Sequence, residues 1–390
     1  LFTKATSIKP TTVTDANIKS GTVCDGPAIL IGTTAYRQSK DANAEIAKES
    51  GAAAYISGNT YTVVYSDAHS AQKLIKTLAT NIEKHSSKNE IKLNSDWNIN
   101  IEGNGEITDQ VFDETDIATQ ATLPKFNGSA LSSPLYAGQG SNIYIQKNAD
   151  IKSFNSFCYD LLKAGFRYYT DNSINGNEFA TYVTKTQIVN VMYFKVKNEV
   201  RIALDKRGTG TSAFDLPTLS SANKYTRSAD PSLTMVEIDN TGYGGGMCFI
   251  YKLSNGKFFV VDSGVNESGS HTSSAKWIYK TLKKLAGNEK IVVASWLITH
   301  VHSDHLGGLY DMSNDSSITG DLTIEQLIHN EPTDDVTKAL DDLSTDSSNK
   351  IWQWMNPIIS AFNIKSVVKA HPGQVFNIAD AKITVLSSQD

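Results

Sequence analysis

Four side chains of the kinds that bind metal ions stand within six positions of this 390-residue chain. They are His300, His302, Asp304 and His305. Imidazole together with carboxylate suits Zn²⁺, with Mn²⁺ or Fe as alternatives by ligand type. Two such ions a few ångströms apart can hold a bridging hydroxide and bring the pKa of a bound water near 7. The spacing therefore predicts a metal-binding loop rather than a feature of packing.

The elements around this loop explain how it could be positioned. Residues 291–298 are a continuous apolar run, which predicts a strand buried on both faces. In an extended segment, side chains two positions apart point the same way, so His300 and His302 present both imidazoles to one side. Asp304 and His305 follow where the backbone turns. The pair at 307–308 is Gly-Gly, which permits a tight turn or helix entry where a Cβ could clash.

Residues 299–308, THVHSDHLGG, closely resemble the THxHxDHxGG signature of the metallo-β-lactamase-fold hydrolases. The preceding KFFVVDSG resembles that superfamily's strand ending in an Asp-x-Gly turn. The resemblance covers about residues 233–390 and implies an αββα sandwich with the site at its strand edge. It implies that His300 and His302 bind one metal, and that Asp304 and His305 bind the other. Asp304 would also orient or deprotonate the attacking water, and Asp262 would brace the loop from outside the ligand set.

The same resemblance implies a metal-dependent hydrolase with two zinc ions. A metal-bound hydroxide would attack an ester, phosphoester or amide bond in a small-molecule or polymer-linked substrate. Residues 366–390 resemble a segment of competence-related and envelope-associated members, which often act on phosphoester or other polymer-linked bonds. The family normally supplies a further His, a bridging Asp and a final His, and none of these is evident before residue 390. We therefore expect a truncated version of a longer protein, in which the site is either incomplete, with metals partly or wholly absent and activity reduced or lost, or completed by another chain.

Two other interpretations stay open. In one, the chain is a secreted, non-catalytic binding or surface protein that works through residues 1–205 and carries a degenerate hydrolase domain. The four intact ligand residues argue against degeneracy, because nothing in folding requires all four. In the other, the chain is a true β-lactamase, although some 230 upstream residues are more than a compact antibiotic hydrolase needs. Fold does not settle the substrate.

Five histidines lie outside the loop, and two of them compete for the missing roles. His329 and His371 follow predicted strands, and we interpret both as packing residues rather than ligands. His271 follows the Asp-Ser-Gly turn and could line a cleft, although packing is the favoured interpretation. His69 and His85 are interpreted as solvated.

The length of the chain predicts several domains, because a single core rarely grows beyond about 250–300 residues. We expect an α/β (α+β) protein with small N-terminal α/β units ahead of a partial metallo-β-lactamase-like αββα sandwich. Residues 1–103 would form the first unit and residues 104–205 the second, which has antiparallel strands. Residues 206–231 are polar and turn-rich and predict a linker, and residues 232–390 would form the metallo-β-lactamase-like domain. Residues 104–140 predict a long surface connection.

The apolar patterns predict individual elements within these parts. The expected strands are 27–32, 53–57, 60–66, 97–101, 142–146, 178–184, 187–196, 200–205, 233–238, 247–253, 257–262, 291–298, 322–328, 366–369 and 382–386. The expected helices are 41–50, 70–84, 151–164, 273–285 and 350–362, the last bent or broken near Pro357.

Composition excludes some classes of function. A net charge of -5 gives no strong nucleic-acid signal, and no apolar run approaches the ~20 residues of a membrane span. Cys24, Cys158 and Cys248 lie far apart, so we expect small buried side chains rather than a zinc ribbon or a disulfide framework. Abundant Ser, Thr, Asn and Tyr and a start at Leu1 favour a bacterial protein that is secreted or in the cell envelope, with a cytoplasmic location as the alternative. The sequence leaves the oligomeric state open.

Overall fold

The computed structural model divides the chain into two compact units, Leu1–Gln110 and Val111–Asp390. It describes residues 19–20, 23–24, 28–32, 34, 36–42, 51–57, 60–65, 74, 77–78, 86–87, 90–91, 98–102, 117–137, 141–209, 211, 213–219, 222–236, 238, 246–267, 273–330 and 351–388. The four-part division expected from the sequence stays a prediction.

The first unit contains a four-stranded sheet in the order β1-β3-β2-β6. Its strands are β1 (Ala28–Ile31), β2 (Gly51–Ser57), β3 (Thr60–Tyr65) and β6 (Ile99–Glu102). A ribbon of β4 (Ser86–Ser87) and β5 (Glu90–Ile91) stands apart from it. β2 and β3, which correspond to the strands expected at 53–57 and 60–66, pair in antiparallel fashion. The helices expected at 41–50 and 70–84 lie largely outside the described residues.

The second unit begins with a six-stranded antiparallel sheet in the order β7-β8-β12-β11-β10-β9. Its strands are β7 (Leu135–Tyr136), β8 (Asn142–Lys147), β9 (Arg167–Ile174), β10 (Asn177–Val183), β11 (Gln187–Phe194) and β12 (Glu199–Lys206). Helix α4 (Ile151–Lys163) covers one face and buries Phe154, Phe157 and Leu161. It starts at Asp150, whose carboxylate accepts from the backbone N–H of Ser153.

The strand β9 and residues 104–140 differ from the expectation. β9 was not predicted, because its sequence RYYTDNSI offers no apolar alternation. Asn175 and Gly176 form the turn that joins β9 to β10, and both have positive φ, 54° and 78°. The segment 104–140 is not purely a surface connection, since Ile117, Phe126 and Ala137 are buried in it.

A seven-stranded sheet follows, with six strands in the order β13-β14-β15-β16-β18-β19 and β17 beside β16. Its strands are β13 (Ser232–Met235), β14 (Phe249–Lys252), β15 (Phe258–Val261), β16 (Ile291–Leu297), β17 (Leu322–Ile324), β18 (Gln326–His329) and β19 (Ser366–Lys369). β15, β16, β18 and β19 are parallel neighbours. Their carboxyl ends therefore meet at one edge, where loops and helix starts are brought together.

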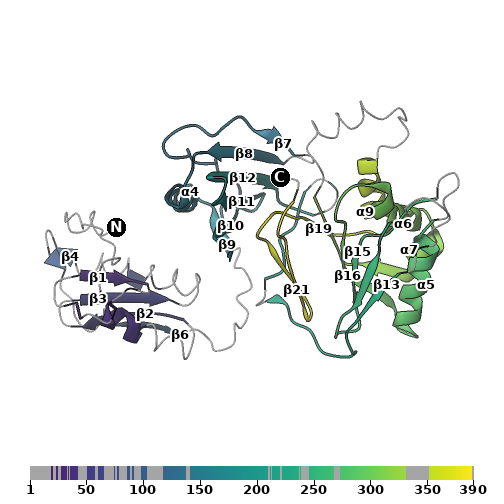
Figure 1. Ribbon diagram of the computed structural model, residues 1–390, viewed down its shortest axis with the longest axis horizontal. Helices are drawn as coiled ribbons and strands as arrows, with labels where there is room; N and C mark the ends of the chain where they lie inside the picture. Colours follow the sequence, from purple (N-terminus) through teal and green to yellow (C-terminus); the bar gives the residue numbers. More distant parts are fainter. Residues whose placement is uncertain are drawn as a thin grey trace. The chain divides into compact units, whose positions relative to one another are not determined.

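The two faces of this sheet are covered differently (Figure 1). Helices α5 (Ala275–Ala286), α6 (Ser303–Ser313), α7 (Ser316–Asp321) and α9 (Met355–Ala361) supply buried residues to the core on one face. The hairpin of β20 (Val375–Ile378) and β21 (Ala381–Thr384) packs on the other.

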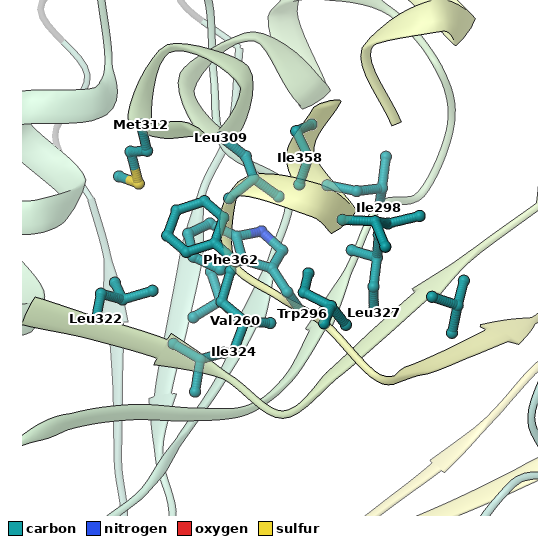
Figure 2. Close-up of a cluster of buried hydrophobic side chains, with 14 of the residues drawn as sticks. Val260, Trp296, Ile298, Leu309, Met312, Leu322, Ile324, Leu327, Ile358 and Phe362 are labelled. Atoms are coloured by element: carbon teal, nitrogen blue, oxygen red, sulfur yellow. The ribbon is translucent and has the colours of Figure 1, made fainter. Parts of the chain in front are cut away.

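Trp296 lies at the centre of the helix-covered core, fully buried among Leu309, Leu327 and Ile358 (Figure 2). Phe214 and Leu216, from the segment expected to be a linker, are buried in the same core. Core residues of the six-stranded sheet, including Val183, also belong to it. The two sheets of the second unit are thus in apolar contact, although the six-stranded sheet also has a separate core beneath α4.

The expected strand at 322–328 is two strands, interrupted at Glu325, whose carboxylate pairs with Lys257. The expected helix at 350–362 is a 3₁₀ turn, η3 (Ile351–Trp354), followed by α9. The break therefore precedes Met355, and Pro357 lies within the first turn of α9, where a missing N–H costs little.

At the level of fold class, the prediction of a mixed α and β protein is confirmed, with several sheets and more strand than helix. Among the described residues, no helix is long and apolar enough to cross a membrane. All three cysteines are free; Cys158 and Cys248 are buried, and Cys24 is partly exposed.

Candidate metal centre

The predicted loop lies where β16 leaves the seven-stranded sheet. The strand ends at Leu297, and the N–H of Ile298 still bonds to the carbonyl of Ile328 on β18. The chain then runs irregularly to His302, which is the N-cap of α6. Asp304 and His305 consequently lie in the first turn of that helix, and Asp304 gains from the positive end of its dipole.

The two glycines of the motif lie inside α6 rather than ahead of it. A Cβ on Gly307 would stand 2.2 Å from the backbone N of Asn266, and one on Gly308 would stand 2.0 Å from the carbonyl O of Ser263. In each case the added Cβ would be fixed to the helix backbone and would meet a backbone atom of the neighbouring loop, so neither could move aside easily. The first turns of α6 are thereby pressed against the loop that follows β15.

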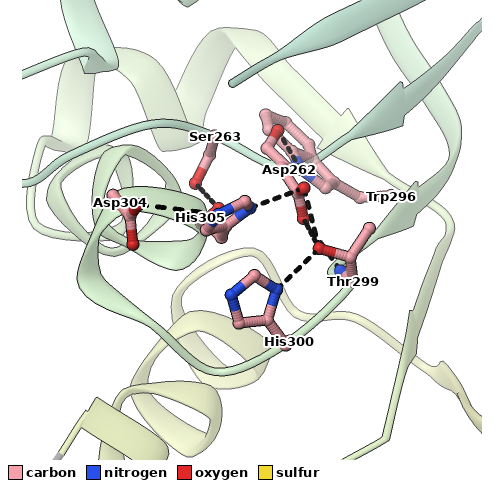
Figure 3. Close-up of polar contacts among 7 residues, drawn as sticks. All are labelled: Asp262, Ser263, Trp296, Thr299, His300, Asp304 and His305. Atoms are coloured by element: carbon pink, nitrogen blue, oxygen red, sulfur yellow. Dashed lines mark hydrogen bonds and ion pairs between the residues drawn. The ribbon is translucent and has the colours of Figure 1, made fainter. Parts of the chain in front are cut away.

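Asp262, the first residue after β15, is the hub of this arrangement (Figure 3). It is fully buried and has a φ of 56°, a conformation that non-glycine residues rarely adopt. Its carboxylate accepts from the backbone N–H of Thr299 at 2.8 Å, from the Thr299 hydroxyl at 2.8 Å and from Nδ1 of His305 at 2.8 Å. Trp296 donates its indole N–H to the Asp262 carbonyl. One carboxylate therefore ties the ends of both neighbouring strands to the start of α6.

These bonds determine which nitrogen of His305 is available. An ionised carboxylate only accepts, so in the neutral ring of His305 the proton is on Nδ1 and Nε2 has the lone pair. That Nε2 lies 3.6 Å from Oδ2 of Asp304. Two donors of one tetrahedral zinc, each near 2.0–2.1 Å from the ion, are about 3.3 Å apart. The pair thus fits a shared metal with a small adjustment.

His300 and His302 complete a group of three imidazoles. The ring of His300 lies 4.6 Å from that of His302 and 4.0 Å from that of His305, measured between ring centroids. Burial, followed by repulsion from His305 and His302, lowers the pKa of His300. His300 is therefore neutral near pH 7, which is the form that binds metals. The side chain of His302 is exposed and makes no capping bond to α6.

The structure brings three rings and one carboxylate together but does not close them around one point. In the part of the chain that it describes, no group of three or more His, Cys, Asp or Glu side chains is positioned to hold a metal ion as it stands. The assignment of His300, His302, Asp304 and His305 as ligands stays a prediction.

The competing histidines are engaged elsewhere or lie outside the described residues. His329 is fully buried against the ring of Phe214, and burial, followed by repulsion from Lys369, lowers its pKa to about 3. His371 places Nε2 2.8 Å from Oδ2 of Asp205, with both side chains buried. His69, His85 and His271 lie outside the described residues.

Thr299 is the participant that the ligand pattern did not indicate. Its hydroxyl lies between the Asp262 carboxylate and Nδ1 of His300, which is 3.0 Å away. The sequence feature that could have indicated Thr299 is its position between the buried strand and the first histidine.

No protein-family model matches the chain, and no curated protein is detectably similar to it in sequence.

Proposed function

We propose that this chain is a metal-dependent hydrolase of the metallo-β-lactamase type, with zinc as its metal and His300, His302, Asp304 and His305 as ligands. In this proposal, residues 232–390 belong to an αββα sandwich, and the complete site holds two ions. Its substrate carries an ester, phosphoester or amide bond.

One observation carries the proposal: Nε2 of His305 faces the Asp304 carboxylate at 3.6 Å, while Nδ1 of the same ring contacts the buried carboxylate of Asp262 at 2.8 Å. Two acceptors directed at each other are unfavourable unless a proton or a cation lies between them. The buried carboxylate of Asp262 holds His305 in this state from the far side of the ring. A carboxylate that orients a metal-binding histidine in this way is common in zinc sites.

Bound zinc would supply a polarised water and neutralise charge developing at the attacked centre. The residues of the chain supply the rest. Asp304 is half exposed and can take a proton from water at Oδ2. The water oxygen forms a bond to the carbonyl carbon or phosphorus as the bond to the leaving group breaks. The proton held by Asp304 then passes to the leaving oxygen or nitrogen.

The first prediction concerns metal binding by the whole 390-residue chain. Zinc affinity, measured by competition with a chromogenic chelator, should fall at least about 100-fold in His302→Ala, because the loss of a direct ligand should exceed the 10–100-fold effect of an outer partner. His85→Ala removes a histidine outside the motif and should bind zinc like the wild type.

Hydrolysis is followed in parallel on a nitrophenyl ester, a bis(nitrophenyl) phosphodiester and a chromogenic β-lactam. Zinc-dependent turnover of any of them that is lost in His302→Ala supports the proposal. A wild-type chain that binds no zinc, or a His302→Ala variant that binds it equally well, would rule the proposed site out. Zinc binding without turnover would favour a non-catalytic role instead.

A further inference from the structure

We infer that Thr299 is a positioning residue: it links Asp262 to His300 and holds the proton of that imidazole on Nδ1, so that Nε2 is presented to the site. The inference rests on the proposed function only in saying that Nε2 of His300 binds a metal. The tautomer itself is a property of the metal-free chain.

The donor and acceptor roles follow from counting hydrogens. The Thr299 hydroxyl has one hydrogen and lies 3.0 Å and 2.8 Å from the two carboxylate oxygens of Asp262. Those oxygens only accept, so the hydroxyl donates its hydrogen to Asp262. The 3.0 Å contact to Nδ1 of His300 must then be donated by the imidazole. His300 therefore has its proton on Nδ1 and a lone pair on Nε2.

The same carboxylate consequently controls two rings by different routes. It fixes His305 directly, through the 2.8 Å bond to Nδ1, and it fixes His300 through Thr299. Free neutral imidazole prefers the opposite tautomer, with the proton on Nε2. Both histidines are thus held in their less favoured state by one buried group, and both lone pairs are left for a metal.

The geometry also explains why a threonine suits this position. The Thr299 N–H donates to Oδ1 of Asp262 at 2.8 Å, and the side chain closes a second contact to the same carboxylate. The backbone and side-chain contacts together fix the χ1 angle of Thr299, and the β-branched side chain restricts the allowed values of χ1 further. A serine would keep the hydroxyl with more rotational freedom. A valine would keep the shape and the backbone bond but could not accept from His300.

The test is histidine-selective ¹⁵N NMR on the metal-free full chain at a pH where the imidazoles are neutral. In the wild type, both His300 and His305 should show a protonated Nδ1 and an unprotonated Nε2. In Thr299→Val, His300 should shift its proton mainly to Nε2, and His305 should remain unchanged because Asp262 still accepts from it directly. Thr299→Ser should restore the His300 tautomer.

Thermal unfolding shows whether each variant is folded, and Thr299→Ala serves in place of Thr299→Val if the latter is not. An unchanged His300 tautomer without the hydroxyl overturns the inference. So does a simultaneous change at His305, because that would signal a general disturbance of the loop.

Zinc competition on the same variants separates this inference from the proposed function. The affinity of Thr299→Val should fall about 10–100-fold, the range typical of groups that orient a ligand. If the tautomer shifts while the affinity does not, the positioning role is wrong although the metal site stands. If the wild type shows the expected tautomers but binds no zinc, the proposed function fails and the link through Thr299 stands.

Discussion

At the scale of single residues, Asp304 has two proposed roles, as a metal ligand and as the group that accepts a proton from water. It faces Nε2 of His305 at 3.6 Å and is exposed enough to meet water. Asp315, by contrast, caps α7, where its carboxylate accepts a hydrogen bond from the backbone N–H of Ser317. A change of carboxylate to amide should therefore separate chemistry from capping.

We predict that Asp304→Asn lowers kcat/KM on the hydrolysed substrate by at least about 10²-fold, since proton transfer by a positioned group contributes 10²–10⁴-fold. The amide keeps the size of the side chain but cannot accept the proton of the attacking water. Asp315→Asn is the matched control, because Asn caps a helix as well as Asp does, and it should leave the rate unchanged. An Asp304→Asn variant as active as the control would contradict the role.

The candidate ligands could be proposed from the sequence because they are close neighbours in it. His300, His302, Asp304 and His305 were proposed from their types and spacing, and their role as ligands stays a prediction. The bond between Asp262 and Thr299 joins positions 37 apart, and the Asp-Ser-Gly turn indicated one partner without indicating the other. The tautomers follow from a hydrogen count that requires the folded geometry.

At the scale of elements, the site depends on how closely α6 approaches the loop after β15. The N–H of Gly308 bonds to the carbonyl of Gly264, and the N–H of Ser263 bonds to the carbonyl of His305. Two adjacent glycines lower the intrinsic stability of a helix by roughly 1 kcal/mol each relative to alanine. Their presence in α6 is explained by this contact, which leaves no room for a Cβ.

We predict that Gly308→Ala destabilises the chain by about 1–3 kcal/mol, because its Cβ would lie 2.0 Å from the Ser263 carbonyl O and force the backbones apart. Gly320→Ala is the matched control in α7, where a Cβ would meet nothing within 4 Å. There alanine should stabilise by up to about 1 kcal/mol. Chemical denaturation measures both. Equal effects of the two substitutions would show that the close approach does not matter.

Strands were predictable where apolar residues form a continuous or alternating pattern, and they were missed where polar residues interrupt that pattern. The buried strand β16 is a continuous apolar run. β9 lies at the sheet edge with alternate residues exposed, and its Thr, Asp, Asn and Ser obscured it. Residues 322–328 were predicted as one strand, whereas the structure has two strands that are interrupted at Glu325.

At the scale of the second unit, the two large sheets are joined by a buried polar network as well as by apolar contacts. Asp205, at the end of β12, accepts from Ser141 and pairs with His371, which follows β19. Asn190 and Gln374 extend the network from the two sides. No local pattern predicts a contact between positions 166 apart, and this is why residues 206–231 were interpreted as a linker between separate domains.

This network makes a prediction about acid stability. Burial alone would raise the pKa of Asp205, but the attraction and hydrogen bond of His371, with Lys369 and Ser141, outweigh it and lower the pKa below its ordinary value. A carboxyl with a lowered pKa in the folded state stabilises the fold above its unfolded pKa of about 3.9, and this contribution disappears as pH falls through the folded value.

We therefore predict that Asp205→Asn lowers the free energy of unfolding by about 3–5 kcal/mol at pH 7, because it leaves a buried partner unpaired. The difference from the wild type should shrink below about pH 4. Urea denaturation at pH 7 and at pH 3 measures this difference, with exposed Asp230→Asn as the control that should match the wild type at both. A deficit in Asp205→Asn that is equally large at both pH values would mean that packing, and not the charge of Asp205, joins the two sheets.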